Sequence, residues 1–594
     1  MKSLRHLSRG IKKFERTLLN DEPSKIQYLG ARSTFARSKE KFIRGQNQEI
    51  IIPSPFGAVT YPNSKISEYI WRNVNKFSKL IALECGITGR KYTYGQTRDA
   101  ANYIARSLRN LKFMEGDIIA LIAPNFPEWV LAFLGILEAD LIVTTINPHY
   151  TVEEITMQLE LSGAKGIVTA KGILPIVKKA ATNYRLGSSL IVIDDGTPGP
   201  MTDGVIPFKD LITRGKNLPE LKALSRSMDD VSVLPFSSGT TGLPKGVMLT
   251  HANLVSNMEM LNAIVDKDTW IQMATDENQD VIPIFLPLFH IFGMNVIMLP
   301  SLTFGAKIVT LPKFQPETFF DTFIKQKPAL LFCVPPVILF LSVSPLAKRE
   351  HFSNVRSVFS GAAPLSKEDV ERFYDKFRLD NNNFKFCQGY GLTECAPVAF
   401  VEKTGLKYAS IGKNICGCDV RLVDIVTNVD ISEPGRNGEL WIRGPHVMKG
   451  YFNNPEATKK MLLEDGWLKT GDIAYFDDDL DFYITDRLKE LIKVKGFQVP
   501  PAELESVLRM HPDVEECAVI GISDARSGEV PRAFVVLKKN RKVSEEDIKN
   551  FVKDKVSEYK QLNGGVSFVR DILKNPTGKI LRTKMKEAYL KGNL

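Results

Sequence analysis

From about residue 90 onward, short apolar runs alternate with helical patterns, and this alternation limits the fold more than any other feature of the chain. The run at 118–123 follows a Glu-Gly-Asp turn, and the apolar residues between 101 and 108 fall on one face of a helix. Further apolar runs lie at 141–143, 166–168 and 190–193. Because strands that alternate with helices are typical of layered sheets, the chain is predicted to be an α/β protein.

A change of pattern near residues 486–490 predicts a second, smaller unit. Strands are expected upstream at 438–442 and 481–484. Downstream, the expected elements are a helix, two strands and a last helix, at 502–510, 514–522, 532–537 and around 548–552. Together the downstream elements make a compact α+β unit of about 100 residues, which is a common domain size. We therefore expect a large multi-subdomain N-terminal domain of layered α/β sheets over 46–486, and a small α+β C-terminal domain over 487–594.

The first 45 residues are predicted to be a basic, amphipathic targeting segment. Leu4, Leu7, Ile11, Phe14 and Leu18 share one helical face, and residues 1–19 carry six basic side chains against one acidic one. This pattern is typical of mitochondrial transit peptides, so a mitochondrial location is expected, with a cytoplasmic one as the alternative. A basic helix lying on a membrane surface, which would make a peripheral membrane contact, stays open. The last four residues, 591–594, do not match the peroxisomal Ser-Lys-Leu signal.

Two uncharged stretches, 281–304 and 328–347, are long enough to cross a bilayer. Each contains several prolines, which would leave backbone groups unpaired in lipid. We therefore expect short buried strands and a helix start at these places, and no transmembrane span.

Charge and cysteine content argue against two other functional classes. The net charge of +10 suits an anionic ligand, but the basic residues are scattered and match no nucleic-acid motif, so no nucleic-acid partner is expected. The seven cysteines include no paired Cys-x-x-Cys spacing, which argues against a zinc site.

A hydroxyl-rich loop is the strongest local signal for chemistry. Its sequence is Ser237-Ser238-Gly239-Thr240-Thr241-Gly242-Leu243-Pro244-Lys245-Gly246. The glycines allow a close approach of the backbone to an anion, the hydroxyls can donate to phosphate oxygens, and Lys245 adds a positive charge. Pro244 before Lys245 and Gly246 after it exclude a Walker A loop. The segment is therefore a candidate triphosphate-binding loop of another type.

Six further segments follow this loop in a fixed order. They are Pro287–Gly293 (PLFHIFG), Gly361–Leu365 (GAAPL), Gln388–Glu394 (QGYGLTE), Trp467–Asp472 (WLKTGD), Asp486–Val499 (DRLKELIKVKGFQV) and Pro576–Ile580 (PTGKI). With the hydroxyl-rich loop, they resemble the adenylate-forming enzymes, which include 4-coumarate–CoA ligases, fatty acyl–CoA synthetases and beetle luciferases. The resemblance covers roughly residues 50–590.

The resemblance implies an ATP-dependent acyl-CoA synthetase that works in two steps. A carboxylate first attacks the α-phosphate of ATP and releases pyrophosphate, and coenzyme A then attacks the acyl-adenylate. Lys579 is expected to bridge the carboxylate and the α-phosphate during the first step. Because this step gathers several anionic groups, positive charge and positioning must supply most of the catalysis.

The resemblance also assigns the nucleotide site. Asp472 is expected to accept hydrogen bonds from the ribose hydroxyls, with Arg487 as its partner. Further AMP-site positions, which line the adenine and the α-phosphate, are Gln388, Gly389, Tyr390 and Thr393. Glu394 corresponds to the ligand of Mg²⁺, which prefers hard oxygen donors.

The acyl and CoA sites follow from the same resemblance. His290 is expected beside the substrate carboxylate, and Ala362 should line the acyl site. Lys489 corresponds to the hinge about which a mobile C-terminal domain would rotate between the two steps. After that rotation, Lys493, Lys495 and Gly496 should serve thioester formation, with Gly496 giving pantetheine a close path along the backbone.

Two positions bear on the acid. Asn257 stands where beetle luciferases carry an arginine, and Phe292 stands where many 4-coumarate ligases carry an aromatic hydroxyl. A more apolar site favours a medium- or long-chain fatty acid, because an apolar wall discriminates by size. The alternatives are a 4-coumarate or other aryl-acid ligase, a luciferase-like enzyme, an adenylating enzyme that loads a carrier protein, and an inactive scaffold. No carrier sequence follows Lys579, and every expected catalytic position is present, which argues against the last two.

Overall fold

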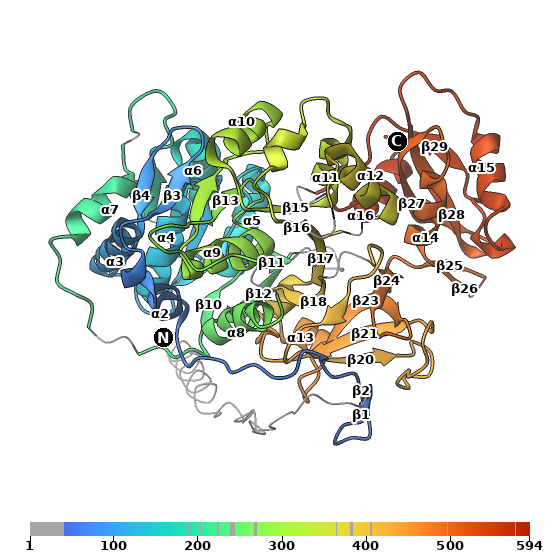
Figure 1. Ribbon diagram of the computed structural model, residues 1–594, viewed down its shortest axis with the longest axis horizontal. Helices are drawn as coiled ribbons and strands as arrows, with labels where there is room; N and C mark the ends of the chain where they lie inside the picture. The colour runs from blue at the N-terminus through green and yellow to red at the C-terminus, as the bar shows by residue number, and fades with distance from the viewer. Residues whose placement is uncertain are drawn as a thin grey trace, which may run out of the picture.

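The computed structural model describes residues 41–186, 189–201, 203–222, 225–237, 244–265, 270–363, 365–380, 384–403, 407–495, 497–575 and 578–594. The predicted targeting segment therefore lies outside the described residues, apart from its last five positions. Figure 1 shows a large body built from the chain up to the yellow and orange strands, and a smaller red unit at the C-terminal end. This is the predicted arrangement of a large α/β domain and a small α+β domain.

The largest sheet contains the strands predicted from the first apolar runs. Its order is β11-β12-β10-β6-β5-β7-β8-β9, and β22 also pairs with β12. The strands are β5 (Ile118–Ile122), β6 (Ile142–Thr145), β7 (Gly166–Ala170), β8 (Leu190–Ile193), β9 (Ile206–Pro207), β10 (Val231–Val233), β11 (Phe236–Ser237), β12 (Lys245–Thr250) and β22 (Gly450–Tyr451). Strands β5 to β8 pair in parallel and are buried throughout, which explains why their sequences are continuously apolar.

Two further α/β sheets complete the larger domain. One has the order β13-β14-β3-β4 and the other β15-β16-β17-β18-β19. Their strands are β3 (Ile81–Cys85), β4 (Lys91–Thr93), β13 (Val281–Ile284), β14 (Lys307–Thr310), β15 (Leu330–Cys333), β16 (Ser357–Ser360), β17 (Lys385–Gly391), β18 (Val398–Glu402) and β19 (Lys413–Asn414). In both sheets, parallel strands are extended by antiparallel strands at one edge.

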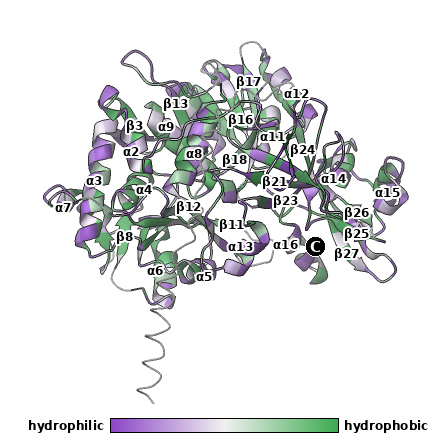
Figure 2. Ribbon diagram, turned by 90° about the horizontal axis from the view of Figure 1, so that it is seen from below, coloured by the Kyte–Doolittle hydropathy of each residue, from purple (hydrophilic) through white to green (hydrophobic). Residues whose placement is uncertain are grey.

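Helices cover these sheets and separate them. They are α2 (Ile66–Trp71), α3 (Tyr94–Asn110), α4 (Pro127–Glu138), α5 (Val152–Ser162), α6 (Leu174–Asn183), α7 (Phe208–Gly215), α8 (His251–Asn262), α9 (Leu299–Phe304), α10 (Pro316–Gln326), α11 (Pro335–Val343), α12 (Lys367–Phe377) and α13 (Pro455–Met461). Helix α4 is buried on all sides except at its end, and the ring of Trp129 stacks on Phe133 at 5.4 Å. Helix α3 lies at the surface, and Figure 2 shows its mixed hydrophilic and hydrophobic faces. A mostly apolar sequence thus marks the inner helix and an amphipathic one the outer helix.

A capping box fixes the start of α3. The Thr93 hydroxyl accepts a hydrogen bond from the Gln96 backbone N–H, and the Gln96 side chain accepts one from the Thr93 N–H. Both bonds satisfy backbone donors that the first helical turn cannot pair.

An antiparallel sheet leads from the larger domain to the smaller one. Its order is β20-β21-β23-β24, formed by Asp419–Val423, Gly438–Arg443, Leu468–Phe476 and Phe482–Arg487. Near the N-terminal end of the described chain, β1 (Ile43–Arg44) and β2 (Ile50–Ile51) form a short antiparallel pair. The last residues of β24 open the segment predicted to be the domain boundary.

The C-terminal unit is an α+β domain with the sheet order β26-β25-β28-β27, in which β29 also pairs with β28. Its elements are β25 (Ile492–Val494), β26 (Phe497–Val499), α14 (Pro501–Arg509), β27 (Val514–Asp524), β28 (Gly528–Leu537), α15 (Glu545–Lys553), β29 (Val566–Phe568) and α16 (Arg582–Leu590). The prediction that the helix around 548–552 is the last one is wrong, because α16 follows it. Helix α16 has four charged residues among nine and only one fully buried residue, Met585, so the apolar signal in its sequence is weak.

The two uncharged stretches are interior elements, as expected. The first forms β13, the π-helix η3 (Phe292–Met298) and α9, and the second forms β15 and α11. In the part of the chain that the structure describes, every helix is too short or too polar to cross a membrane. The π-helix was not predicted from the sequence. It begins two residues after His290, in the segment expected to approach the substrate.

Candidate nucleotide and acyl site

The hydroxyl-rich loop connects two antiparallel strands of the largest sheet. Ser237 at the end of β11 pairs with Lys245 at the start of β12. The two ends of the candidate phosphate loop are therefore held side by side by the sheet. Ser238, Gly239, Thr240, Thr241 and Gly242, which were predicted to contact phosphate, lie outside the described residues.

The Glu394 carboxylate lies beside the ends of this loop. The hydroxyl of Ser237 donates to Glu394 Oε1 at 2.9 Å, and the phenol of Tyr451 donates to the same oxygen at 2.9 Å. Glu394 belongs to the short 3₁₀-helix η5 (Thr393–Cys395), which also contains the predicted residue Thr393. The candidate metal ligand is thus fixed by two hydroxyl donors from two different strands.

Asp472 is the centre of a second polar cluster. The Tyr390 phenol donates to Asp472 Oδ2 at 2.6 Å, and Arg487 forms an ion pair with Asp472, with 3.1 Å between Nε and Oδ1. Asp472 on β23 and Arg487 on β24 are direct cross-strand partners, and Asp472 is only 2% exposed. Burial, reinforced by the Asp472 carboxylate, raises the pKa of Tyr390 well above its usual value, so the phenol stays protonated and donates. The pair predicted to bind ribose is therefore preformed.

Strand β17 carries three of the predicted nucleotide-site residues, Gln388, Gly389 and Tyr390. The Gln388 side-chain amide donates to the backbone carbonyl of Tyr408, which ties this strand to the segment after β18. The Tyr390 ring packs edge-on against Phe400, with 5.8 Å between ring centroids. A Cβ atom on Gly361 would lie 3.3 Å from the Gly389 carbonyl oxygen, so the backbones of the two predicted segments approach closely.

Lys579 of the C-terminal unit interacts electrostatically with the charges of this cluster. Burial, together with the positive charge of Arg487, lowers the pKa of Lys579 to about 8, while Glu490 and Asp472 act in the opposite direction. Lys579 is held locally by its backbone N–H, which donates to Asn575 Oδ1 at 2.9 Å.

The loop that carries Lys579 also packs against the larger domain. Gly578 has a φ of +84°, and a Cβ atom there would lie 2.5 Å from Cγ of Pro336 at the start of α11. Glycine is therefore required at this position both by its backbone conformation and by the close approach of Pro336.

Arg582 anchors the same loop from the other side. It bonds to Glu490 and donates from Nη2 to both carboxylate oxygens of Glu505 at 2.8 Å. Glu505 is buried in α14 and also accepts the backbone N–H of Val519 at 2.9 Å. The loop therefore has a firm connection to the body of the C-terminal unit.

His290 lies at the predicted acyl end of the site. Burial lowers the pKa of His290 to about 4, so the imidazole is neutral at physiological pH. Its Nδ1 accepts the Phe292 backbone N–H at 3.3 Å, which leaves the proton on Nε2. The Phe292 ring comes within 3.7 Å of a Cβ position on Gly361, and Ala362 follows in a left-handed conformation with φ of 71°. His290, Phe292 and the segment of Ala362 thus form one wall.

Lys493 and Lys495 are arranged differently from Lys579. Both side chains are exposed, and their backbone N–H groups bond within the C-terminal unit, to Glu529 Oε2 at 3.1 Å and to the Ser527 carbonyl at 2.7 Å. Gly496 lies outside the described residues. Within the part of the chain that the structure describes, Lys493 and Lys495 therefore show no bond to the nucleotide cluster in this arrangement.

Lys489, the predicted hinge residue, interacts electrostatically with the end of the candidate triphosphate loop. Burial lowers the pKa of Lys489, and so do the positive charges of Lys245 and Lys460. Nearby, burial raises the pKa of Asp486 to about 7, although its carboxylate accepts the N–H groups of Ala502 and Arg487 at 3.0 and 2.6 Å.

Sequence reasoning missed several residues of the site. Tyr451, Tyr408, Lys460 and Arg582 all contact or approach predicted residues, but they lie in segments whose local pattern is ordinary. Only Tyr451 stands next to a recognisable signal, since Gly450 precedes it with a φ of +144°.

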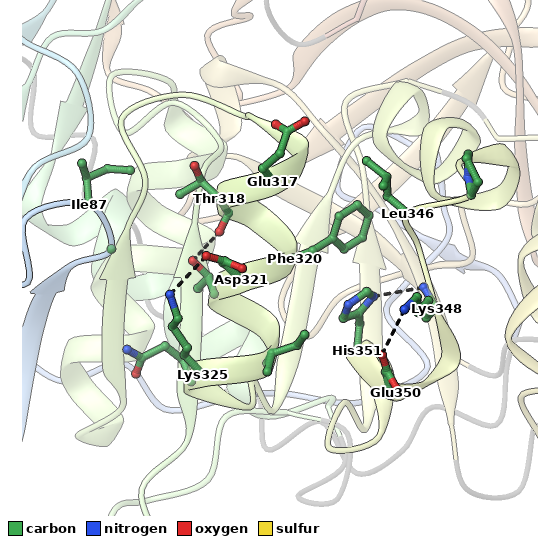
Figure 3. Close-up of a pocket in the computed structure, with 15 residues that line it drawn as sticks. Ile87, Glu317, Thr318, Phe320, Asp321, Lys325, Leu346, Lys348, Glu350 and His351 are labelled. Carbon is green, nitrogen blue, oxygen red and sulfur yellow. Dashed lines mark hydrogen bonds and ion pairs between the residues drawn. The ribbon is translucent and has the colours of Figure 1, made fainter.

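A separate hollow of about 630 Å³ lies between α10 and the segment 345–351, and it shares no residue with the site described above (Figure 3). Ion pairs join Lys325 to Asp321 at 3.1 Å and Lys348 to Glu350 at 3.8 Å along it. Both of its lysines are thus paired with carboxylates of the same hollow, and nothing among its lining residues points to a particular ligand.

Comparison with known proteins agrees with this geometry. The family "AMP-binding enzyme" matches residues 70–452, and "AMP-binding enzyme C-terminal domain" matches 503–579. The chain is 38% identical over 561 residues to 4-coumarate–CoA ligase 1 of Arabidopsis thaliana, covering 93% of this chain and 98% of that protein.

Two solved structures are similar throughout. One is ATP-bound MatB from Rhodopseudomonas palustris, with a TM-score of 0.78, 25% identity, and coverage of 90% of this chain and 100% of that one. The other is the anthranilate CoA ligase AuaEII in complex with anthranoyl-AMP, with a TM-score of 0.78, 26% identity, and coverage of 90% and 98%. The protein therefore belongs to the AMP-binding enzyme family, among its ATP-dependent, AMP-forming acid–CoA ligases.

Proposed function

We propose that the enzyme joins an aryl acid of the cinnamate or benzoate type to CoA, with conversion of ATP to AMP and pyrophosphate. The observation that carries this proposal is the 38% identity to a 4-coumarate–CoA ligase over nearly the whole chain. Relatives of this kind favour the aryl-acid alternative over the fatty acid that was first expected.

The wall around His290 supports the same substrate class. Phe292 presents an aromatic ring beside Gly361, and a planar aryl group can stack on such a ring. The amide of Asn257 is buried and bonded to strand β18, because Nδ2 donates to the Val398 carbonyl at 2.7 Å and Oδ1 accepts the Val398 N–H at 3.2 Å. Asn257 is therefore bonded to the protein's own backbone and is not expected to be a polar contact for substrate.

In the first step, a carboxylate oxygen of the acid attacks the α-phosphorus of ATP, and the bond to the β-phosphate oxygen breaks to release pyrophosphate. Lys579 supplies positive charge to the carboxylate and the α-phosphate, which repel one another as they approach. Its pKa of about 8 means that the group is mainly protonated at neutral pH. The two oxygens of Asp472 each accept one protein donor and each retain a lone pair for a ribose hydroxyl.

Glu394 fits the Mg²⁺ ligand that the family implies. Its carboxylate is a hard oxygen donor, and both of its hydrogen bonds from described residues end at Oε1, so Oε2 is the oxygen that would bind the ion. A bound Mg²⁺ would supply neutralising charge to the phosphates. Ser237 and Tyr451 hold the carboxylate, and Lys245 adds charge at the end of the loop.

In the second step, the thiol of CoA attacks the carbonyl carbon of the acyl-adenylate, and AMP leaves with the electron pair of the broken mixed-anhydride bond. We assign this step to Lys493, Lys495 and Gly496 after the C-terminal unit has turned about Lys489. The contact between Gly578 and Pro336 must separate during this turn, since it joins the two units.

The experiment is an acid panel. Purified enzyme with ATP, Mg²⁺ and CoA is given 4-coumarate, cinnamate, benzoate, octanoate and palmitate, and each thioester is quantified by mass spectrometry. We expect kcat/KM to be highest for one of the three aryl acids. A preference for octanoate or palmitate would reject the proposed substrate class, and the inactive variant Lys579→Ala controls for contaminating ligases.

We also propose that residues 1–45 direct the protein to mitochondria, on the basis of their basic, amphipathic pattern. A fusion of this segment to a fluorescent protein should enter mitochondria. A fusion in which Arg5, Arg9 and Arg16 are replaced by glutamate should not. Equal import of both fusions would contradict the proposal.

A further inference from the structure

Tyr451 lies where the phosphate loop and the candidate metal ligand meet. Strand β22 pairs antiparallel with β12, so Tyr451 is opposite Val247, two residues from Lys245. The backbone N–H of Tyr451 donates to the Thr458 hydroxyl at 2.9 Å, which connects this position to α13. The residue is 4% exposed, and its place is therefore fixed by a strand, a helix and the surrounding core.

The side chain of Tyr451 makes two contacts with different partners. Its phenol donates to Glu394 Oε1 at 2.9 Å, and its ring lies under the Lys245 ammonium, with 5.0 Å from Nζ to the ring centroid. A backbone bond reinforces the first contact, because the Met448 N–H donates to the Glu394 carbonyl at 2.8 Å. One side chain thus touches both a carboxylate suited to a cation and a cation suited to phosphate.

Each contact has a distinct physical consequence. A hydrogen bond to a metal-binding carboxylate fixes its orientation, and the loss of such a partner typically weakens metal binding. A ring beneath an ammonium group attracts it electrostatically and restricts where a flexible lysine can go. The phenol therefore acts on the metal side of the site and the ring on the phosphate side.

We propose that Tyr451 is a positioning residue that prepares Glu394 and Lys245 to bind the metal-bound triphosphate of ATP. The proposal rests on the role of Glu394 given under the proposed function. It does not depend on which acid the enzyme uses, because nucleotide and metal bind without acid or CoA.

The test separates the two contacts with two variants. Tyr451→Phe removes the hydrogen bond to Glu394 and keeps the ring under Lys245, whereas Tyr451→Leu removes both. The matched control is Tyr92→Phe, because the Tyr92 phenol donates to the Glu128 carboxylate at the same distance of 2.9 Å and belongs to the sheet of β3 and β4. It deletes an equivalent bond outside the site.

The main readout is binding of Mn²⁺ to the enzyme in the presence of ATP, measured by electron paramagnetic resonance without acid or CoA. We expect Tyr451→Phe to raise the dissociation constant of Mn²⁺ about tenfold. ATP affinity without metal, measured by calorimetry, should stay unchanged in Tyr451→Phe and weaken roughly threefold in Tyr451→Leu. Tyr92→Phe should match the wild type in both measurements.

Several results would overturn the proposal. They are an unchanged Mn²⁺ dissociation constant in Tyr451→Phe, an equal change in Tyr92→Phe, or no effect of Glu394→Gln on Mn²⁺ binding. Because Tyr451→Leu could also unfold, the decisive variant is Tyr451→Phe, whose melting temperature should match that of Tyr92→Phe. If the wild type binds Mn²⁺ and ATP but makes no aryl thioester, the substrate proposal fails and this one stands.

Discussion

The buried charge of Lys579 should lower the stability of the arrangement in which the C-terminal unit contacts the larger domain. The replacement Lys579→Met tests this expectation directly. Burial lowers the pKa of Lys579 from 10.5 to about 8. Since one pKa unit corresponds to about 1.4 kcal/mol, holding the charged form at this place costs about 3 kcal/mol at neutral pH. This is an upper limit, because the C-terminal unit can open and return the ammonium group to water. Methionine keeps the apolar stem without the charge.

The sign of the pH dependence follows from the depressed pKa. Below pH 8 the lysine is charged in both the folded and the unfolded chain, so the full cost is present. As the pH rises from 8 to 10.5, the folded protein loses its proton before the unfolded chain does, and the cost disappears. Lys579→Met should therefore melt at a higher temperature than the wild type at pH 7, and the difference should vanish towards pH 10.5.

Thermal unfolding of the two proteins at pH 6.5, 7.5, 8.5 and 9.5 is the assay. Lys539→Met is the matched control, because Lys539 is exposed in the same unit and should give no pH-dependent difference. Lys579→Met should also lose acyl-adenylate formation, measured as pyrophosphate exchange. A stability difference that grows with pH, or a variant less stable than the wild type at pH 7, would refute the reasoning.

Three further variants test other contacts of the site. Asp472→Asn weakens the bond to Arg487 and removes the charge of the ribose acceptor. Because bonds to charged groups contribute about 1.5–3 kcal/mol, the KM for ATP should rise about tenfold or more. An unchanged KM in steady-state kinetics would contradict the ribose role. Gly578→Ala puts a side chain against Pro336 at a positive φ, so pyrophosphate exchange should slow while thioester formation from supplied acyl-adenylate stays normal; equal loss of both would count against the docking contact. Arg582→Met leaves the buried Glu505 carboxylate without its cation and should cost about 3–5 kcal/mol in urea unfolding, whereas a loss below 1 kcal/mol would show that the pair is not needed.

The sequence predicted the elements better than their contacts. The apolar run predicted at 190–193 has the same bounds as β8, because a strand that is buried on both faces has a continuously apolar sequence. Asp472 and Arg487 were both identified through the family resemblance. Arg487 was named as the partner of Asp472, but their place directly opposite one another on β23 and β24 was not predicted, because strand register depends on partners that the local sequence does not name.

Residues of the site were missed for the same reason, because their contacts are with partners that the local sequence does not name. Tyr451 is 57 residues from Glu394 along the chain, and no periodicity connects the two positions. Lys489 was predicted to be a hinge residue from its motif, but its closeness to Lys245 depends on how the two units meet. Helix α16 was missed for a different reason, since its sequence is highly charged and has only one fully buried residue, which leaves a weak apolar pattern.

The anchoring of Arg582 limits how the two half-reactions can be combined. Arg582 follows Lys579 by three residues and bonds to Glu490, the neighbour of the pivot residue Lys489, and to Glu505 in α14. Lys579 is therefore fixed to the body of the C-terminal unit and should move with it as one rigid piece. If the C-terminal unit turns about Lys489 as proposed, a turn that presents Lys493 would withdraw Lys579 from the nucleotide at the same time. The adenylation and thioester steps would then have to alternate, because the two lysines could not act on the substrate together.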